Sequence, residues 1–328
     1  MIDPRLVGPR SGGLRGQAVL GQTQRVYREA FQLFSDFTFQ KHGVRVSLSL
    51  SATEMDAYME DYIDSLYVFY DGRMQHLATR ALLGVFQELS FSYRGQLPNS
   101  SRCLRAWKRL HPAQSARPLP RSWVDLIAVT LALRGEGVAG IGILVAYEGY
   151  LRVGELLGLR REHVLLPEDA VSDFDLRDGG CGLRLVSTKR GANQFARISD
   201  PAVVRYLRGL IRITPPGGLL FPSLTARKLN SLISLSLRVW GLPDDFTMHS
   251  LRHGRAAAAF LACVPPDEIR LAGRWSVLFS MEPYLQASLV LTFSLRSASA
   301  EVRGLAHLCA RLRPFLVELG ALVLGAAQ

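Results

Sequence analysis

The sequence predicts a mainly helical protein with one small antiparallel β-sheet, and three observations support this prediction. Apolar residues recur at helical spacing over most of the 328 residues. Between residues 163 and 200 the apolar period shortens to that of β-strands. The stretch from His111 to Pro120 contains Pro112, Pro118 and Pro120, which interrupt helix and mark a domain boundary. We therefore expect two domains, the second of which contains the sheet.

The first domain is expected to be a helical unit over residues 25–117. Residues 1–24 precede it, rich in Gly, Arg and Gln and without clear periodicity, and are expected to form a basic lead-in. Ser51 and Glu54 have the spacing of a capping box, in which a hydroxyl and a carboxylate satisfy the first backbone N–H groups of a helix. Helices are predicted near residues 24–36, 51–70, 73–92 and 101–110.

The last of these helices is short and carries four cations, Arg102, Arg105, Lys108 and Arg109. One interpretation is a solvated helix face. The other is contact with a DNA backbone, because phosphates bind clustered Lys and Arg side chains. The sequence leaves both interpretations open.

The second domain is expected over residues 118–328, ending in a helical tail. Two buried helices are predicted within residues 121–151, and the second is almost wholly apolar, so it should lie at the centre of the core. Gly191 and Asn193 favour a hairpin turn, which places Lys189 near the tip of the hairpin. A single lysine in a turn is most often only solvated.

Charge and composition limit the class of function. The chain has 39 Lys and Arg against 28 Asp and Glu, a net charge of +11, which favours an anionic partner such as nucleic acid but also fits a general solubility charge. Four scattered cysteines suggest neither a metal site nor a disulfide framework. No signal peptide, compact import signal or membrane-length apolar run is visible. We expect a soluble intracellular protein, nuclear if the source is eukaryotic and otherwise in the cytoplasm or nucleoid.

The residue types near the C-terminal end of the chain suggest chemistry on a phosphodiester. His249 and Arg252 are three residues apart and should share one helix face. A guanidinium offers a rigid fork of donors that suits a phosphate, and the indole of Trp275 is a further donor. Tyr284, nine residues after Trp275, carries a hydroxyl that can act as a nucleophile.

A further arginine stands directly after the predicted apolar helix. Arg152 needs a partner if it is buried, and Glu155, three residues later, can supply a carboxylate. The alternative interpretation is an ordinary surface ion pair at the start of a helix.

Taken in chain order, these residues resemble the active-site set of the tyrosine recombinases, also called phage-integrase-type recombinases. The resemblance rests on Arg152 in a Leu-Arg-x-x-Glu-Leu-Leu-Gly-Leu context, Lys189, His249-x-x-Arg252, Trp275 and Tyr284. It covers about Ser122 to Ala287 as the catalytic domain, and the helical domain before it resembles the DNA-binding core domain of that family. The sequence is closer in style to recombinases of eukaryotic mobile elements than to the best-known phage enzymes. The family often has histidine where Trp275 stands, and tryptophan is a known alternative.

The resemblance implies how the groups that move protons and form bonds would act. Tyr284 would attack the phosphorus and form a 3′-phosphotyrosine link. His249 would serve as base or positioner, and Lys189 would protonate the leaving 5′-oxygen.

The remaining groups would bind the phosphate. Arg152 and Arg252 would clamp it, Trp275 would donate an N–H to it, and Glu155 would hold Arg152 in place. The resemblance implies no cofactor and no metal.

The implied function is that of a site-specific DNA recombinase or integrase, acting as a homotetramer on paired sites in double-stranded DNA. Two alternatives remain open. A type IB topoisomerase-like enzyme would relax DNA and pack its C-terminal tail on its own domain, whereas a recombinase tail would dock into a neighbouring subunit. A catalytically silent DNA-binding protein derived from a recombinase would lack a catalytic residue.

Overall fold

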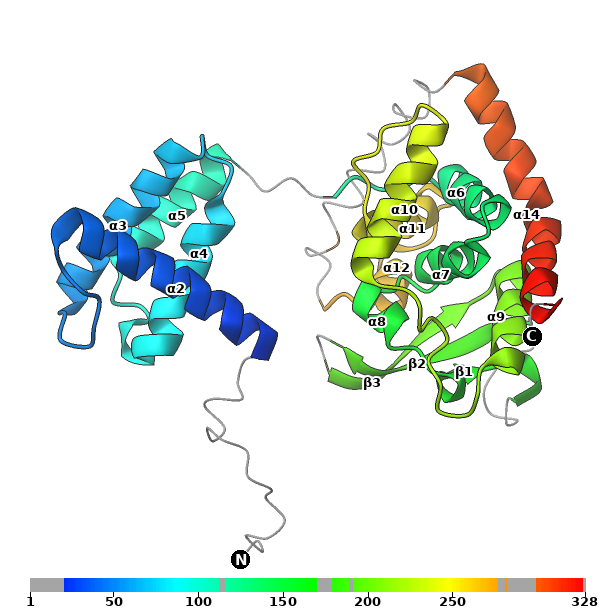
Figure 1. Cartoon of the computed structure of the whole chain (residues 1–328), viewed down its shortest axis with the longest axis horizontal. Helices are drawn as coiled ribbons and strands as arrows, with labels where there is room; N and C mark the ends of the chain where they lie inside the picture. Colours follow the sequence, from blue (N-terminus) through cyan, green and yellow to red (C-terminus); the bar gives the residue numbers. More distant parts are fainter. Residues whose placement is uncertain are drawn as a thin grey trace, which may run out of the picture. The chain divides into compact units, whose positions relative to one another are not determined.

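The computed structural model describes residues 21–111, 116–169, 179–188, 191–276, 281 and 299–326, and divides the chain into two compact units, Met1–Gln114 and Ser115–Gln328 (Figure 1). Side chains are described in all these ranges except at residues 21, 22, 187, 188, 191, 192 and 315–326. Most of the predicted lead-in therefore lies outside the described residues, although its last four residues are already helical, because the first helix begins at Gly21.

All the regular secondary structure in the described part of the first unit is helical. Its elements are α2 (Gly21–His42), α3 (Ala52–Phe69), α4 (Gln75–Gly84), a π-helical turn at Val85–Leu89, a 3₁₀ turn at Phe91–Tyr93 and α5 (Pro98–Leu110). The predicted capping box is present at the start of α3, where the carboxylate of Glu54 accepts from the Ser51 backbone N–H at 2.8 Å.

A buried carboxylate joins α3 to α5. Asp56, on α3, accepts from the backbone N–H groups of Asn99 and Ser100, both at 2.9 Å, and from the Ser100 hydroxyl at 2.6 Å. Since Asp56 caps the first turn of α5 from another helix, it fixes where α5 begins. The core of this unit includes Phe34, Met55, Met59, Ile63 and Trp107.

The second unit contains most of the helices and the sheet. Its elements are α6 (Arg121–Leu133), α7 (Gly137–Glu148), α8 (Val153–Leu157), β1 (Val164–Leu165), β2 (Cys181–Thr188), β3 (Gly191–Ile198), α9 (Pro201–Ile213), α10 (Ala226–Val239), α11 (Met248–Leu261), α12 (Pro266–Ala272) and α14 (Ala300–Ala326). The strands pair antiparallel in the order β1-β2-β3, with Leu183 opposite Val164 on one side and Ala196 on the other. The expectation of a mainly helical chain with a small antiparallel sheet is confirmed.

Helices α6 and α7 form the centre of this unit, with α14 along one side and the sheet next to α7 (Figure 1). Every residue of α7 from Ala139 to Glu148 is buried, as its apolar sequence predicts. Helix α11 packs closely against the chain at Leu119, whose backbone N–H donates to the Ser250 carbonyl at 3.0 Å. Any side chain at Gly254 would collide with the backbone of Leu119, so this approach requires glycine.

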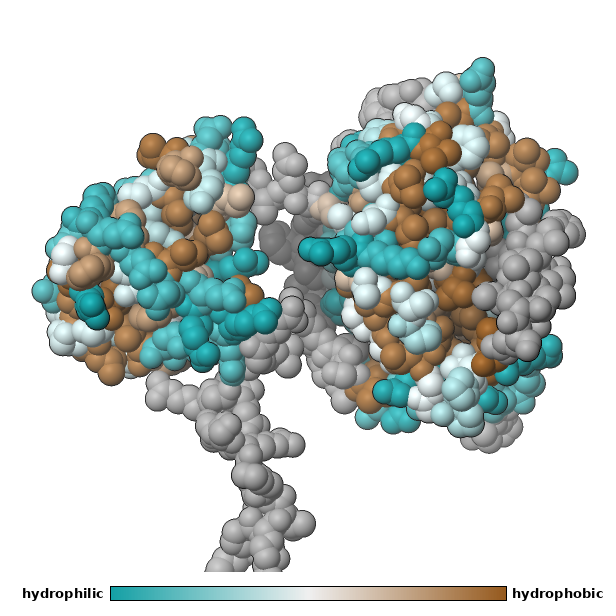
Figure 2. Space-filling model, in the orientation of Figure 1, coloured by the Kyte–Doolittle hydropathy of each residue, from teal (hydrophilic) through white to brown (hydrophobic). Residues whose placement is uncertain are grey.

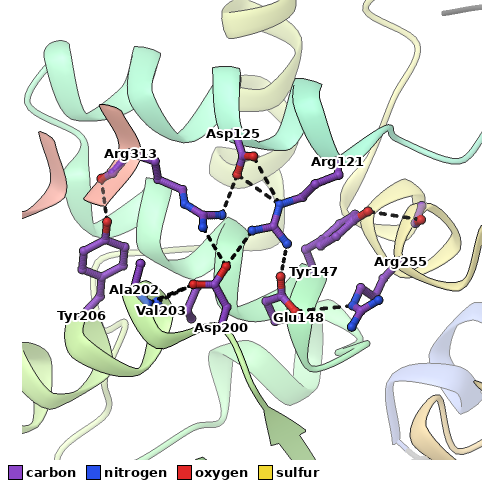
Figure 3. Close-up of polar contacts among 11 residues, drawn as sticks. Arg121, Asp125, Tyr147, Glu148, Asp200, Ala202, Val203, Tyr206, Arg255 and Arg313 are labelled. Atoms are coloured by element: carbon purple, nitrogen blue, oxygen red, sulfur yellow. Dashed lines mark hydrogen bonds and ion pairs between the residues drawn. The ribbon is translucent and has the colours of Figure 1, made fainter. Parts of the chain in front are cut away.

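A network of buried ion pairs joins four of these helices (Figure 3). We call it the structural network; its members are Arg121, Asp125, Glu148, Asp200, Arg255 and Arg313. Arg313, on α14, donates to Asp125 of α6 at 2.7 Å and to Asp200, which caps α9, also at 2.7 Å. Arg121 contacts Asp125, Asp200 and Glu148.

The described side chains of α14 pack on their own unit. Ala306 and Cys309 are buried, and the hydroxyl of Tyr206 donates to the Arg313 carbonyl at 2.6 Å. Leu308 and Leu312 are exposed. The buried face instead follows residues 302, 306, 309 and 313, which share one side of the helix.

Hydrophilic and hydrophobic residues are mixed over the face of each unit in view in Figure 2. None of the described helices is both long enough and apolar enough to span a membrane.

Candidate active site

The predicted active-site residues that the structure describes all lie in the second unit. Arg152 precedes α8, Glu155 lies within it, His249 and Arg252 lie on α11, and Trp275 follows α12. Lys189 and Tyr284 lie outside the described residues.

Arg152 and Glu155 form the predicted ion pair. Nη1 of Arg152 lies 2.6 Å from Oε1 of Glu155, and its backbone N–H donates to Oε2 at 2.9 Å. The Glu155 side chain is only 4% exposed and that of Arg152 is 25% exposed, so this is not a surface pair. Burial raises the pKa of Glu155, but the backbone N–H of Arg152 and the guanidinium groups of Arg274 and Arg152 lower it more, and the net shift is downward. The carboxylate is therefore ionised near neutral pH.

Arg252 is one of the largest buried side chains, at 2% exposure. Its Nη1 donates to the Tyr150 carbonyl at 2.6 Å and its Nη2 donates to the Gly273 carbonyl. Its guanidinium carbon lies 4.5 Å from the centre of the Trp275 ring. These contacts fix the plane of the guanidinium from two sides.

Trp275 belongs to a small apolar cluster of its own. Its ring meets that of Tyr150 edge to face at 6.1 Å, and Met281 packs into the same cluster with no exposed surface. A side chain at Gly273 would collide with the Trp275 ring, so a glycine there lets the indole fold back over α12.

His249 is exposed near the start of α11, and its ring lies 4.2 Å from that of His253. His253 is 2% exposed, and its Nδ1 lies 2.7 Å from the Ala116 carbonyl, to which it donates. Burial lowers the pKa of His253 to about 4, with smaller contributions in the same direction from His249 and Arg252. A neutral, fixed imidazole therefore packs beneath His249. A side chain this buried is not available for contact with DNA.

Arg274 is the residue that the sequence analysis missed. It directly precedes Trp275 in the chain, but nothing local distinguishes it from other arginines. Its side chain is 7% exposed, and its Nη2 lies 2.9 Å from Oε2 of Glu155 and 3.1 Å from the Tyr150 carbonyl.

We call Arg152, Arg252, Arg274 and Glu155 the site cluster. Its members are joined through Glu155 and the Tyr150 carbonyl, and it holds three guanidinium groups against one carboxylate. Partly buried positive charge that exceeds the carboxylates among the described residues attracts an anion. The geometry suits a phosphate, because guanidinium forks match its oxygens.

Two further features lie beside this cluster. Strand β2, which leads toward Lys189, contacts α8. A cavity of about 410 Å³ lies between them and is lined in part by Glu155, Arg160 and Arg184. Within the part of the chain that the structure describes, no group of three or more His, Cys, Asp or Glu residues could hold a metal ion.

In the first unit, the four predicted DNA-binding cations lie on the exposed face of α5. Arg102, Arg105, Lys108 and Arg109 are all exposed, while Trp107 on the opposite face is buried and donates to the Gly72 carbonyl at 2.7 Å. None of the four cations forms an ion pair with another described residue of the chain. This face offers positive charge to an outside partner.

No family model and no curated protein matches this chain. The chain is similar to the solved structure of XerH site-specific recombinase in a post-cleavage complex with a palindromic difH substrate, with 15% identity, coverage of 84% of this chain and 78% of that one, and a TM-score of 0.55. The chain is also similar to XerA recombinase, with 16% identity, coverage of 86% of this chain and 95% of that one, and a TM-score of 0.40. A third similarity is to the Tn1549 transposon integrase in complex with circular intermediate DNA, with 14% identity, coverage of 78% of this chain and 94% of that one, and a TM-score of 0.43. The likeness to XerH shows a shared fold.

Proposed function

We propose that this protein, whose chain has the tyrosine-recombinase fold, is a site-specific DNA recombinase or integrase that breaks and rejoins DNA through a 3′-phosphotyrosine intermediate. The observation that carries the proposal is the site cluster, in which Glu155 pairs with Arg152 and Arg274 and the Tyr150 carbonyl joins Arg274 to Arg252. Such a cluster suits a phosphodiester, whose non-bridging oxygens carry the charge of the transition state.

The two arginines would have different tasks. Arg152, at 25% exposure, is the more accessible and would contact a non-bridging oxygen of the phosphate directly. Arg252 is held by two carbonyls and the Trp275 ring, so its charge would act on the phosphate from a fixed position in a medium of low dielectric. Trp275 would add an N–H donor.

Tyr284 is proposed as the nucleophile. Its oxygen would form a bond to phosphorus as the bond from phosphorus to the 5′-oxygen breaks, and Lys189 would give that oxygen its proton. His249, resting on His253, would accept or position the proton of the tyrosine, whose ordinary pKa of about 10 is too high for attack without help. Met281 supports this assignment, because it is anchored beside Trp275 and three residues of chain reach at most about 11 Å.

The intermediate would conserve the energy of the phosphodiester, so the 5′-hydroxyl of another strand could reverse the reaction. No cofactor or metal is needed for these steps. The exposed cations of α5 would hold the DNA backbone, and a homotetramer on paired sites would allow strands to be exchanged.

The test is covalent capture on a pool of nicked duplexes of varied sequence, in which cleavage releases a short fragment and traps the protein on DNA. Wild-type protein should form an adduct that survives denaturation, and peptide mapping should find the DNA on Tyr284. Tyr284→Phe should bind the pool but form no adduct, whereas Tyr70→Phe in the first unit should behave as wild type. An adduct with Tyr284→Phe, or no wild-type adduct across the whole pool, would refute the proposal.

A type IB topoisomerase-like activity is the second candidate, and the packing of α14 favours it. Arg313 and Tyr206 hold this helix on its own unit, as expected for a tail that is not exchanged. The two candidates separate on a supercoiled plasmid that carries two captured sites. Relaxation without rearrangement of the sites would support the topoisomerase, and rearranged products would support the recombinase.

A further inference from the structure

One buried guanidinium lies between the two arginines that the proposed function assigns to the phosphate. Arg274 donates to Glu155, which also holds Arg152, and to the Tyr150 carbonyl, which also accepts from Arg252. We propose that Arg274 is a positioning residue that sets the distance and orientation between Arg152 and Arg252. The inference rests on the proposed function for those two arginines.

Toward Arg152, the connection runs through both oxygens of Glu155. Oε1 accepts from Nη1 of Arg152 at 2.6 Å. Oε2 accepts from the Arg152 backbone N–H at 2.9 Å and from Nη2 of Arg274 at 2.9 Å. The carboxylate therefore cannot turn without breaking a contact to one of the two arginines, so Arg274 limits the positions open to Arg152.

Toward Arg252, the connection runs through one carbonyl. The Tyr150 oxygen accepts from Nη1 of Arg252 at 2.6 Å and from Nη2 of Arg274 at 3.1 Å. Nη1 of Arg274 also lies 3.2 Å from the Gly149 carbonyl. Tyr150 itself has a φ of 51°, which is rare for a residue with a side chain, so the direction of its carbonyl is held by these contacts rather than by local preference.

The backbone of Arg274 supports a role for its side chain. Its φ is 58°, and it ends α12 in the left-handed conformation that usually favours glycine. Cys263 ends α11 in the same way, with a φ of 60°, but its side chain is exposed. At residue 274 the same unfavourable backbone is combined with a buried charged side chain, which indicates that the guanidinium is needed there.

A purely structural role is the alternative. Burial lowers the pKa of Arg274, and the nearby charge of Arg152 lowers it further, while Glu155 opposes both. The two like charges of Arg274 and Arg152 therefore repel each other, which makes the charged form of Arg274 less favourable. This repulsion is tolerable if Arg274 is needed to orient Arg152. A positioning role and a purely structural role predict different results on a substrate that lacks the phosphate charge.

The experiment compares Arg274→Gly with Cys263→Gly, a matched change at the other left-handed helix end. Each full-length variant is assayed for single-turnover adduct formation on a captured wild-type site and on the same site with a methylphosphonate at the scissile position. The methylphosphonate lacks the negative charge that the two arginines would neutralise. DNA affinity and melting temperature are measured alongside.

We expect Arg274→Gly to slow adduct formation by about 10–100-fold on the phosphodiester, the usual loss when a residue that orients a functional group is removed. The loss should be smaller on the methylphosphonate, DNA affinity should change little, and Cys263→Gly should match wild type on both substrates. Equal losses on the two substrates, or no loss, would overturn the proposal. If Arg274→Gly does not fold, Arg274→Lys, which keeps the charge and loses the fork, is judged by the same comparison.

A separate measurement distinguishes failure of this inference from failure of the proposed function. If wild-type protein forms no adduct, the proposed function is wrong. Melting temperatures of the variants then test whether Arg274 and Arg152 are coupled. Arg274→Gly and Arg152→Ala should then lower the melting temperature together by an amount that differs from the sum of their separate effects, because they share Glu155. Additive shifts would show that Arg274 and Arg152 are not coupled.

Discussion

Two clusters of buried charge lie in the second unit, and they differ in charge balance. The structural network pairs three arginines with three carboxylates, on α6, α7, α11, α14 and the residue that caps α9 (Figure 3). The site cluster has as many arginines but only one carboxylate. Both clusters lie in the same unit and use the same residue types, so they differ in the ratio of arginines to carboxylates.

A balanced network needs no partner from outside the chain. Its charges are desolvated, and their mutual attraction offsets that cost only because each has a well-placed opposite. Burial raises the pKa of Asp125, whereas the guanidinium groups of Arg313 and Arg121 outweigh burial at Asp200 and lower its pKa. Among the described residues, the site cluster holds three arginines and one carboxylate, so it can offer positive charge to an anion. Positive charge in excess of the described carboxylates therefore distinguishes the candidate site from the structural network.

The largest expected effect is on stability, from Asp200→Ala. This change removes the carboxylate that accepts from Arg121 at 2.8 Å and from Arg313 at 2.7 Å, and it also removes the cap of α9. Loss of one partner in a buried pair costs roughly 3–5 kcal/mol of unfolding free energy. Urea unfolding measures this, and Asp200→Asn, which can still cap the helix, should recover only about 1 kcal/mol. Full stability in Asp200→Asn would mean that the ion pairs contribute nothing.

The next effect is on catalysis, from Arg252→Lys. A lysine cannot reproduce the fork that binds two carbonyls, so the rate of adduct formation should fall by about 10²–10³-fold. Arg255→Lys, one helical turn later on α11, is the matched control and belongs to the structural network. Arg255→Lys should lower the free energy of unfolding but leave the rate of adduct formation close to that of wild type. If both variants lose cleavage equally, the two clusters do not differ in function.

A third prediction concerns pH and the histidine beneath the site. The pKa of His253 falls from an ordinary value of 6.5 to about 4 in the folded protein, so the folded state binds fewer protons than the unfolded chain between these values. The stability from the neutral imidazole is therefore present above pH 6.5 and is lost as the pH falls toward 4, by about 3 kcal/mol.

His253→Asn should flatten the pH dependence of stability between pH 6.5 and 4, as measured by urea unfolding at several pH values. The exposed His307 provides the control, because His307→Asn should leave the wild-type slope unchanged. If the unfolding free energy of His253→Asn depends on pH as steeply as that of wild type, another group causes the loss of stability.

The smallest expected effect comes from an ion pair outside both clusters. Arg208 and Glu168 lie 2.8 Å apart with side chains 35% and 51% exposed. Arg208→Ala should change the unfolding free energy by roughly 0–1 kcal/mol, since solvent screens such pairs. A cost comparable to that of Asp200→Ala would mean that burial does not separate strong from weak pairs in this protein.

Much of the local structure could be predicted from the sequence, because its causes are local. The cap formed by Ser51 and Glu54 lies within four residues, and the apolar run of α7 could only be buried. The ion pair of Arg152 and Glu155 followed from their spacing on one helical turn. The shared fold with XerH confirms the fold that the ordered set of residues implied, while the roles of all the predicted site residues stay predictions.

The rest depended on contacts between distant parts of the chain. Arg313 pairs with Asp125 and Asp200, which are 188 and 113 residues away in sequence, so no pattern around any one of them could reveal the network. The burial of His253 and the bridging position of Arg274 are of the same kind.

The sequence by itself determined most of the helices, the change to strand period and the residue types proposed to bind a phosphate, since periodicity and caps act over a few positions. Gly191 and Asn193, expected in the hairpin turn, lie in β3 instead. Only the tertiary structure decided which charges balance one another and which remain in excess. The physical reason is that an ion pair depends on the distance between side chains after packing, and packing places α12 beside Tyr150 and α14 beside α6.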